Sequence, residues 1–316
     1  MQVRVARKKH EAIDICSLEL VHPEGGALPE FSAGAHIDVH TPGGLVRQYS
    51  LCNDPAESHR YLIGTLKDPQ SRGGSKAIHE EVQVGDLLQI GLPRNNFALV
   101  PDAEHFILLA GGIGVTPLVS MALQLAREGQ SFEFHYCARS RERAAFADQM
   151  LAAPYAAKVQ FHFDDGDPGQ KLNLNKVLAQ PAARKYVYAC GPAGFLNHVR
   201  DEAKKSAWSL SSVQFESFGA VAMERAGDSS FEVRIASTGI TYKIPANISV
   251  VTALAAQGVD IAVSCEQGIC GTCLTGVLDG EPDHRDTYLT DEERMLNDSF
   301  LPCCSRARTA LLTLDL

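Results

Sequence analysis

Apolar and polar residues alternate over short stretches in the first hundred positions of the chain. Residues 35–40 alternate small or branched apolar residues with histidine and aspartate, which is the two-residue period of a strand with one buried face. Turn-forming glycines and prolines interrupt the region at 42–44, 73–74, 85–86 and 92–93. Short strands separated by such turns predict a small antiparallel β-barrel or sandwich over residues 1–101.

The pattern changes to strand–helix alternation over residues 102–222. Residues 106–110 are continuously apolar, as in a parallel strand that is buried on both faces. Glycines follow, then Thr116 as the expected helix N-cap and Pro117 in the first turn. Apolar residues then recur at helical spacing, at Leu118, Met121, Ala122 and Leu125. With further strands predicted over 132–136, 159–163 and 186–189, the region is expected to form an α/β domain with a parallel sheet.

A third segment follows a linker of small residues, predicted over residues 219–228. Two strands, 231–236 and 240–244, flank a turn, and a short helix is predicted over 250–257. Residues 229–316 are therefore expected to form a separate α+β domain. Residues 106–126 carry no charge and are long enough to span a bilayer. The glycines in their middle nevertheless favour a strand, a loop and a helix, so no membrane partner is expected.

The net charge of −9 is unevenly distributed along the chain. Residues 229–316 contain 12 acidic and 6 basic side chains. This balance disfavours nucleic acid as a partner and is compatible either with solubility alone or with an acidic docking face. No apolar stretch follows the basic residues at the start, so we expect no secretory signal. Nine cysteines then indicate reduced thiols or metal ligation in a cytoplasmic protein.

Four of the cysteines have the spacing of an iron–sulfur ligand set. Cys265, Cys270, Cys273 and Cys303 form a C-x4-C-x2-C-x29-C pattern, which is typical of plant-type [2Fe–2S] ferredoxins. Glycines within the loop permit the close backbone approach that a cluster requires. A structural zinc site prefers two short cysteine pairs and fits less well. Cys304 adjoins Cys303 and is the alternative fourth ligand.

Two glycine-rich turns predict a nucleotide site. Gly112 and Gly114, with Thr116 and Pro117 after them, lie between a buried strand and a helix, where main-chain N–H groups bind a pyrophosphate. Cys190, Gly191 and Pro192 follow another buried strand. The carboxyl ends of such strands line one crevice, although each turn alone is compatible with an ordinary strand–helix connection.

These turns do not distinguish NAD from NADP, which carries an additional 2′-phosphate on its ribose. No carboxylate follows the second predicted strand, where one would hold the ribose 2′-hydroxyl of NAD. Arg139, with Ser140 and Arg143 nearby, could instead contact a 2′-phosphate or form a solvated basic turn.

The two glycine-rich turns resemble the pyridine-nucleotide domain of the ferredoxin–NADP reductase superfamily. In the first domain, Arg47, Tyr49, Ser50 and Leu51 resemble the flavin motif of the same superfamily. A phosphate site is predicted further on, with hydroxyls, cations and flexible backbone contributed by Thr65, Lys67, Gly73, Gly74 and Ser75.

Taken with the 215–219 segment and the end around Cys303, the order of the three segments resembles the phthalate dioxygenase reductase family. That family includes the reductase subunits of vanillate O-demethylases, and the resemblance covers essentially the whole chain. It implies an antiparallel β-barrel that binds FMN, an α/β domain that binds NADH in preference to NADPH, and a [2Fe–2S] domain. It also implies a separate Rieske oxygenase as the electron acceptor.

Roles for individual residues follow from this resemblance and from electron counting, since a nicotinamide donates two electrons at once and a cluster accepts one. Tyr49 is expected to stack on the flavin and Ser50 to contact its N5 atom. Thr116 and Cys190 are expected beside the nicotinamide. Phe218 is expected either over the flavin ring or in the core. Two alternatives remain, a reductase with a ferric or general acceptor and a non-catalytic redox sensor.

Overall fold

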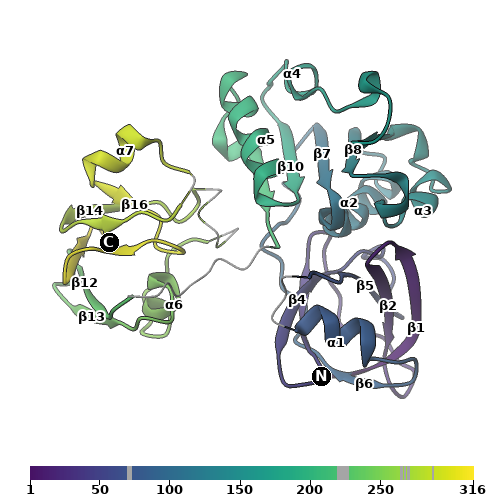
Figure 1. Ribbon diagram of the computed structural model, residues 1–316, viewed down its shortest axis with the longest axis horizontal. Coiled ribbons are helices and arrows are strands. Elements are labelled where there is room, and N and C mark those ends of the chain that lie inside the picture. The colour runs from purple at the N-terminus through teal and green to yellow at the C-terminus, as the bar shows by residue number, and fades with distance from the viewer. Residues whose placement is uncertain (70–72, 219–227, 264–265, 267, 269–270, 287) are drawn as a thin grey trace. The chain divides into compact units, whose positions relative to one another are not determined.

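The computed structural model describes residues 1–316 except 70–72, 219–227, 264–265, 267, 269–270 and 287. The described chain forms two compact units, Met1–Glu216 and Ser217–Leu316 (Figure 1). The first unit contains both the predicted barrel and the predicted α/β segment. The expected boundaries at 101 and 222, and the linker over 219–228, stay predictions. No helix among the described residues is long and apolar enough to cross a membrane.

A closed antiparallel barrel forms the start of the first unit. One sheet has the order β5-β2-β1-β6, and β3 pairs with β4. The bridge from Leu51 to Ile63 joins the end of β4 to β5, while the bridge from Val39 to Ile90 joins β3 to the residue after β6. These two bridges close the ring. The strands are β1 (Gln2–Ala12), β2 (Ile15–Val21), β3 (His36–His40), β4 (Val46–Ser50), β5 (Tyr61–Leu66) and β6 (Leu87–Gln89), and the helix α1 (Gly74–Glu80) lies between β5 and β6.

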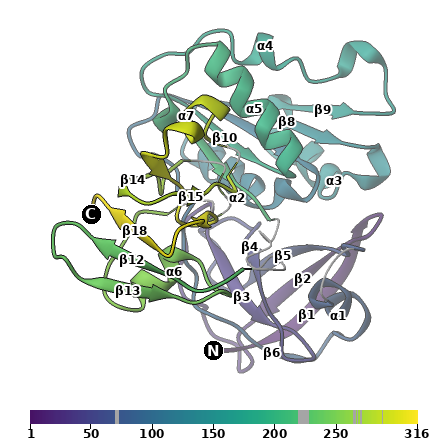
Figure 2. The ribbon, with the colours of Figure 1, turned by 60° about the vertical axis from the view of Figure 1, so that its left-hand side comes forward.

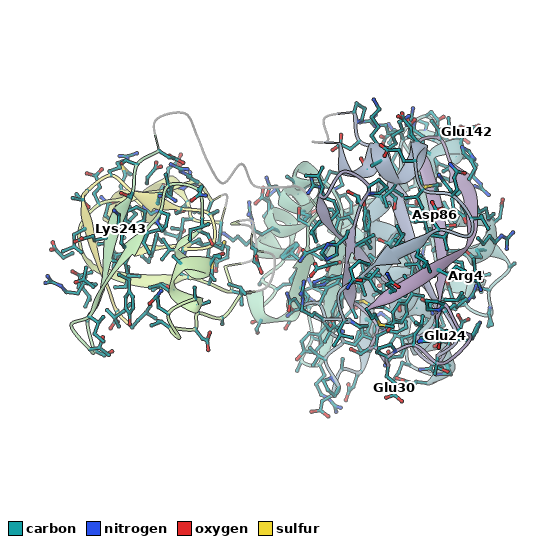
Figure 3. The ribbon with its side chains drawn as sticks, turned by 90° about the horizontal axis from the view of Figure 1, so that it is seen from below. Arg4, Glu24, Glu30, Asp86, Glu142 and Lys243 are labelled. Carbon is teal, nitrogen blue, oxygen red and sulfur yellow. The ribbon has the colours of Figure 1, made fainter. Side chains whose placement is uncertain are left out.

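Alternation along the strands explains which side chains fill this barrel. In β1, Val3 and Val5 are fully buried while their neighbours Gln2 and Arg4 are exposed. Branched residues from the other strands complete the interior. Figure 3 shows Arg4 on the outward face of β1. The barrel prediction is confirmed.

A parallel sheet with the order β11-β10-β7-β8-β9 completes the first unit. Figure 2 shows the helices of this region beside the strands, and α2 contacts β7 and β8 whereas α5 contacts β10 and β11. The strands are β7 (His105–Gly111), β8 (Phe132–Ala138), β9 (Val159–Phe163), β10 (Lys185–Cys190) and β11 (Val213–Glu216). The α-helices are α2 (Val115–Arg127), α3 (Ala147–Leu151), α4 (Leu174–Val177) and α5 (Ala193–Lys205).

The start of α2 differs from the sequence-based expectation. The N-cap is Gly114 and the helix begins at Val115, so the prediction that Thr116 is the N-cap was wrong. The Thr116 hydroxyl instead donates to the Ile113 carbonyl at 3.1 Å, because a short 3-10 turn over Gly112–Gly114 leads directly into the helix. The predicted apolar face is present, since Leu118, Met121, Ala122 and Leu125 are all buried.

The second unit is a small α+β fold, as expected. Its mixed sheet has the order β13-β12-β18-β14-β16, and β15 pairs separately with β17. A core of Val233, Leu254, Phe300, Leu312 and their neighbours packs between this sheet and α6. The strands are β12 (Phe231–Ile235), β13 (Thr241–Ile244), β14 (Thr275–Asp279), β15 (Pro282–Asp283), β16 (Ser299–Phe300), β17 (Arg306–Ala307) and β18 (Leu311–Leu314), and the helices are α6 (Val250–Ala255) and α7 (Asp291–Leu296).

Candidate active site and cluster site

Three polar side chains meet where the barrel and the parallel sheet come together in the first unit. Ser50 is the last residue of β4, while Cys190 and Glu216 end the neighbouring strands β10 and β11. The Ser50 hydroxyl donates to Glu216 Oε2 at 3.3 Å, and Cys190 Sγ lies 4.0 Å from the same oxygen. Two residues that the sequence predicted separately are therefore joined through a carboxylate.

Burial controls the protonation of this group of side chains. Part of residue Glu216 remains exposed, but its carboxylate lies against the buried Ser50 and Cys190. Burial raises the pKa of Glu216 to about 8, and the hydrogen bond from Ser50 opposes this rise. Burial, and then the Glu216 charge, raise the pKa of Cys190 well above its ordinary value. Cys190 is therefore a neutral thiol, not a thiolate nucleophile.

The two glycine-rich turns pack against each other at the same end of the sheet. A Cβ on Gly114 would lie 2.2 Å from the Cys190 carbonyl oxygen and 2.6 Å from the Gly191 nitrogen. Gly191 in turn lies against Gly111. Pro192 is exposed and is the N-cap of α5. Only glycine allows this approach of main chains, so the two predicted turns meet at one end of the sheet, and the nucleotide crevice there stays a prediction.

Thr116 connects the nucleotide turn to the barrel. Its side chain is buried, and its methyl group lies 2.8 Å from the position of a Cβ on Gly64, in β5. Thr65 follows on that strand and is fully buried. The structure therefore places Thr116 at the junction between the predicted flavin and nucleotide residues.

Four of the predicted flavin residues lie around the start of α1. Arg47 lies beside Gly74, where a Cβ would come within 2.8 Å of Arg47 Cγ and Nε. Gly73 has a φ of 101°, and the Ser75 hydroxyl accepts from the Asp68 N–H at 3.2 Å. This glycine-lined cradle next to a guanidinium fits the phosphate of a flavin nucleotide. Arg72 lies outside the described residues.

Other predicted flavin residues are held more tightly. Leu51 is fully buried in the barrel core, so it offers a cofactor only its main chain. Lys67 forms an ion pair with Glu80 at 2.9 Å. Tyr49 is half-buried, and burial raises the pKa of its phenol to about 12, so the ring remains neutral.

The arginines of the turn after β8 differ in their partners. Arg143 pairs with Asp14 at 3.2 Å, and Arg141 pairs with Asp148. Arg139 lies beside a carboxylate pair that sequence reasoning missed, because the Asp165 N–H donates to the Arg139 carbonyl and the Asp164 N–H to that of the preceding residue. The residues that follow β9, rather than those that follow β8, supply these carboxylates, and only the pairing of β8 with β9 reveals this.

Glu216 was also missed as a functional residue. The sequence placed it within the 215–219 motif but assigned it no role, since a single carboxylate after a short strand carries no chemical signal by itself. The parallel pairing of β10 with β11 sets Glu216 opposite Cys190. Phe218, by contrast, is 42% exposed, and its role over the flavin stays a prediction.

The described part of the cluster site brings two of the four predicted ligands together. Cys273 and Cys303 are buried in one small core. Cys303 lies within hydrogen-bond reach of Cys273 and of Cys304, and these contacts, followed by burial, raise the pKa of the Cys303 thiol. Cys265 and Cys270 lie outside the described residues, so the ligand set as a whole stays a prediction. Two adjacent thiols nevertheless fit the thiolate donors of an iron–sulfur cluster.

Two glycines of the cluster loop lie in close contact with neighbouring residues of the second unit. Gly268 has a φ of 70°, and a Cβ at this position would lie 2.4 Å from Cys304 Sγ and 2.8 Å from Asp286 Cα. Gly271, with a φ of 76°, lies equally close to the Tyr288 ring. Cys304 Sγ contacts the Leu301 carbonyl at 3.7 Å. Cys304 Sγ therefore lies against Gly268 of the loop, while Cys303 reaches both Cys273 and Cys304.

Comparisons with known proteins agree with this arrangement. A family model described as a 2Fe-2S iron-sulfur cluster binding domain matches residues 233–308. The chain is 52% identical over 316 residues to vanillate O-demethylase oxidoreductase from a Pseudomonas species, covering 100% of both chains. It is 41% identical to phthalate dioxygenase reductase from Burkholderia cepacia, covering 100% of this chain and 97% of that protein.

A solved structure extends the likeness to three dimensions. Its subject is phthalate dioxygenase reductase, described as a modular structure for electron transfer from pyridine nucleotides to [2Fe-2S]. It aligns with a TM-score of 0.69 at 41% identity, over 100% of this chain and 98% of that one. The expected cofactors, FMN, a [2Fe–2S] cluster and NADH, are those of this family. The chain is an oxidoreductase and belongs to the phthalate dioxygenase reductase family.

Proposed function

We propose that this protein is the reductase component of a Rieske-type aromatic oxygenase or O-demethylase. It takes a hydride from NADH onto FMN and passes single electrons through its [2Fe–2S] cluster to the oxygenase. The observation that carries the proposal is the meeting of Ser50, Cys190 and Glu216 at the strand ends, in a chain that also pairs Cys273 with Cys303. The full-length likeness to a vanillate O-demethylase oxidoreductase supports that class of partner.

A bound flavin supplies the conversion between hydride and single-electron transfer that no side chain performs. The protein contributes binding and orientation. Arg47, Gly73, Gly74 and Ser75 hold the phosphate end, with Thr65 and Lys67 nearby. Tyr49 supplies an aromatic face, Leu51 supplies main-chain contacts, and Ser50 presents its hydroxyl to the flavin edge.

The nicotinamide end of the site is formed by neutral or shielded groups. Cys190 is a neutral thiol, and Thr116 lies at the junction with the barrel, so both can contact a nicotinamide without adding to its ring as nucleophiles. Gly112, Gly114, Pro117, Gly191 and Pro192 line the pyrophosphate crevice. The raised pKa of Glu216, about 8, keeps its carboxyl group protonated at neutral pH, next to the Ser50 hydroxyl.

The preference for NADH over NADPH follows from charge near the predicted adenosine end. Arg139 is accompanied by Asp164 and Asp165. Two carboxylates repel a 2′-phosphate and can accept hydrogen bonds from a ribose 2′-hydroxyl. We assign the protein to the cytoplasm, since its thiolate ligands need a reducing compartment.

The decisive experiment is a coupled assay with purified holoprotein. NADH should bleach both flavin and iron–sulfur absorption, and a vanillate-type O-demethylase oxygenase with its aromatic substrate should accelerate NADH oxidation. Cys303→Ser should abolish the cluster and the coupling but preserve NADH-to-flavin reduction, whereas Cys304→Ser should preserve both. Flavin and cluster reduction without coupling to any Rieske oxygenase would favour the alternative, a reductase with a ferric or general acceptor. Protein with full iron that binds no flavin would refute the proposal.

A further inference from the structure

An exposed apolar stripe lies on the second unit. The side chains of Leu274, Leu278, Met295 and Leu296 are 43%, 61%, 73% and 68% exposed. Single exposed leucines are ordinary on protein surfaces, but neighbouring ones mark interaction sites. Here the β14–β16 pairing places β14 beside the end of α7, and capping interactions hold α7 in place.

Strand register brings the four residues together. Gly276 of β14 pairs with Ser299 of β16, and the Val277 N–H donates to the Asp298 carbonyl at 2.7 Å. If this antiparallel register continues by one residue, Leu278 lies beside the connection from α7 to β16. The helix α7 ends at Leu296, just before that connection. Leu274, which precedes β14, and Leu278 within it are both exposed. The stripe therefore runs along β14 and onto the end of α7.

The helix that carries Met295 and Leu296 is firmly held. Thr290 and Glu293 form a capping box at its start, and Asn297 ends it in the left-handed conformation. The Arg294 guanidinium donates to the Asp286 carbonyl at 2.5 Å. These interactions hold both ends and the middle of α7. The exposure of Met295 and Leu296 is therefore a property of the folded helix and does not result from fraying.

The rim of the stripe is acidic. Asp315 occupies the space above Gly276, between Leu274 and Leu278, since a Cβ on Gly276 would lie 3.1 Å from Asp315 Cβ. Within residues 274–279 and 291–298, Arg294 is the one cation, and it forms ion pairs with Asp286 and Asp291. The other exposed charges of the same described segments are all carboxylates, at Asp279, Asp291, Glu292, Glu293 and Asp298.

One end of the stripe adjoins a cluster ligand. Leu274 directly follows Cys273, which is buried with Cys303 in one small core. Transfer of an electron between proteins requires that they touch close to the donor. A partner bound to the stripe would contact Leu274, the residue next to Cys273.

We propose that this stripe, comprising Leu274, Leu278, Met295, Leu296 and their acidic rim, is the surface on which the terminal oxygenase docks. The chemistry of the stripe specifies a partner surface with an apolar centre and a basic rim. This inference rests on the proposed function and adds to it the place where the electrons leave the protein.

The test compares two lysine variants in the full-length holoprotein. Met295→Lys combined with Leu296→Lys removes the apolar end of the stripe. Ile240→Lys is the matched control, since Ile240 is also 50% exposed but precedes β13, at the opposite edge of the sheet from β16. Figure 3 labels Lys243 on that strand. The probe is the vanillate-type oxygenase used in the coupled assay, at several ionic strengths.

The double variant should raise the KM for the oxygenase about tenfold, as expected for loss of central interface contacts, with unchanged cluster reduction by NADH. The control should match the wild type. The wild-type KM should also rise with salt, because an acidic rim is screened. Equal KM values in all three proteins would overturn the docking surface alone, as would slower cluster reduction in the double variant, which would assign the stripe to the first unit of the same chain. Absence of coupling in the wild type would overturn both proposals.

Discussion

Glu216 is the residue whose chemistry depends most on its surroundings. Its folded pKa of about 8 lies above the ordinary value of 4.5, so between these values the folded protein holds a proton that the unfolded chain releases. Stability therefore falls as pH rises through this window and is lowest above pH 8. Glutamine at this position has no proton to lose and keeps the hydrogen bond to Ser50.

The Glu216→Gln variant should consequently gain stability relative to the wild type between pH 5 and pH 9, by roughly 2 kcal/mol after allowance for partial exposure. Its rate of flavin reduction by NADH should fall about tenfold, because a proton-holding group next to Ser50 is lost. Thermal unfolding and stopped-flow absorbance measure the two effects. A variant with wild-type rate and an unchanged stability profile would show that the carboxylate is solvated and idle.

At the residue level, patterns that carry their own chemistry identified residues that the structure brings together. Gly114 and Cys190 were both identified from glycine-rich turns, and they touch. Glu216, Asp164 and Asp165 were not assigned a role, since their partners come from neighbouring strands and no local spacing records that pairing. Thr116 was placed correctly at the start of α2 but given the wrong cap role, because a 3-10 turn before the helix has no distinct sequence signal.

At the scale of single elements, α1 illustrates how a short helix is held in place. Lys8 Nζ, from β1, donates to the Ile78, His79 and Val82 carbonyls at 3.0, 2.8 and 2.7 Å. These are carbonyls at the end of the helix that would otherwise lack partners. The opposite end carries Gly73 and Gly74, the predicted phosphate cradle, so Lys8 positions that cradle without touching it.

Lys8→Met should therefore weaken FMN binding about tenfold, or ~1.4 kcal/mol, while leaving the binding of riboflavin, which has no phosphate, unchanged. Lys9→Met is the matched control, since Lys9 is exposed and forms an ion pair with Glu11 rather than with α1. Flavin fluorescence titration of the flavin-depleted protein measures both affinities. A parallel loss of FMN and riboflavin affinity would indicate a general distortion of the barrel instead.

Element types were well predicted because their periods are distinct. The buried run at 106–110 and the alternating run at 35–40 became β7 and β3. The helix α7 was not expected, since its six residues contain no apolar face directed at the core. Its capping box is visible in the sequence as Thr290 and Glu293, but a capping pair alone does not establish a helix.

At the scale of the whole molecule, the chain consists of two compact units that divide between Glu216 and Ser217. Asp228 forms a buried ion pair within the second unit. The Arg285 guanidinium donates to both carboxylate oxygens of Asp228 at 2.9 and 2.5 Å, and both side chains are 6% exposed. Arg306 lies 4.0 Å away. Removing Asp228 would leave the buried Arg285 with Asp283 alone, at 2.6 Å, so much of the compensation of its charge would be lost.

Asp228→Ala should therefore destabilise the second unit by about 3 kcal/mol without affecting the first. Glu281→Ala, which removes an exposed ion pair with Arg308, should cost about 0.5 kcal/mol or less. Thermal loss of the iron–sulfur absorption reports on the second unit, and flavin release reports on the first. Simultaneous loss of both signals at a lowered temperature would mean that the units unfold together.

The position of Glu216 at the very end of the first unit has a practical consequence for building chimeras. A designer who transplants the NADH–flavin module onto a different electron carrier would choose a junction in the segment that follows β11. Cutting even one residue early would discard the carboxylate beside Ser50 while leaving every other strand, helix and glycine turn of the module intact. Such a fusion would fold and would bind both nucleotides, and its slow turnover would be blamed on the new carrier.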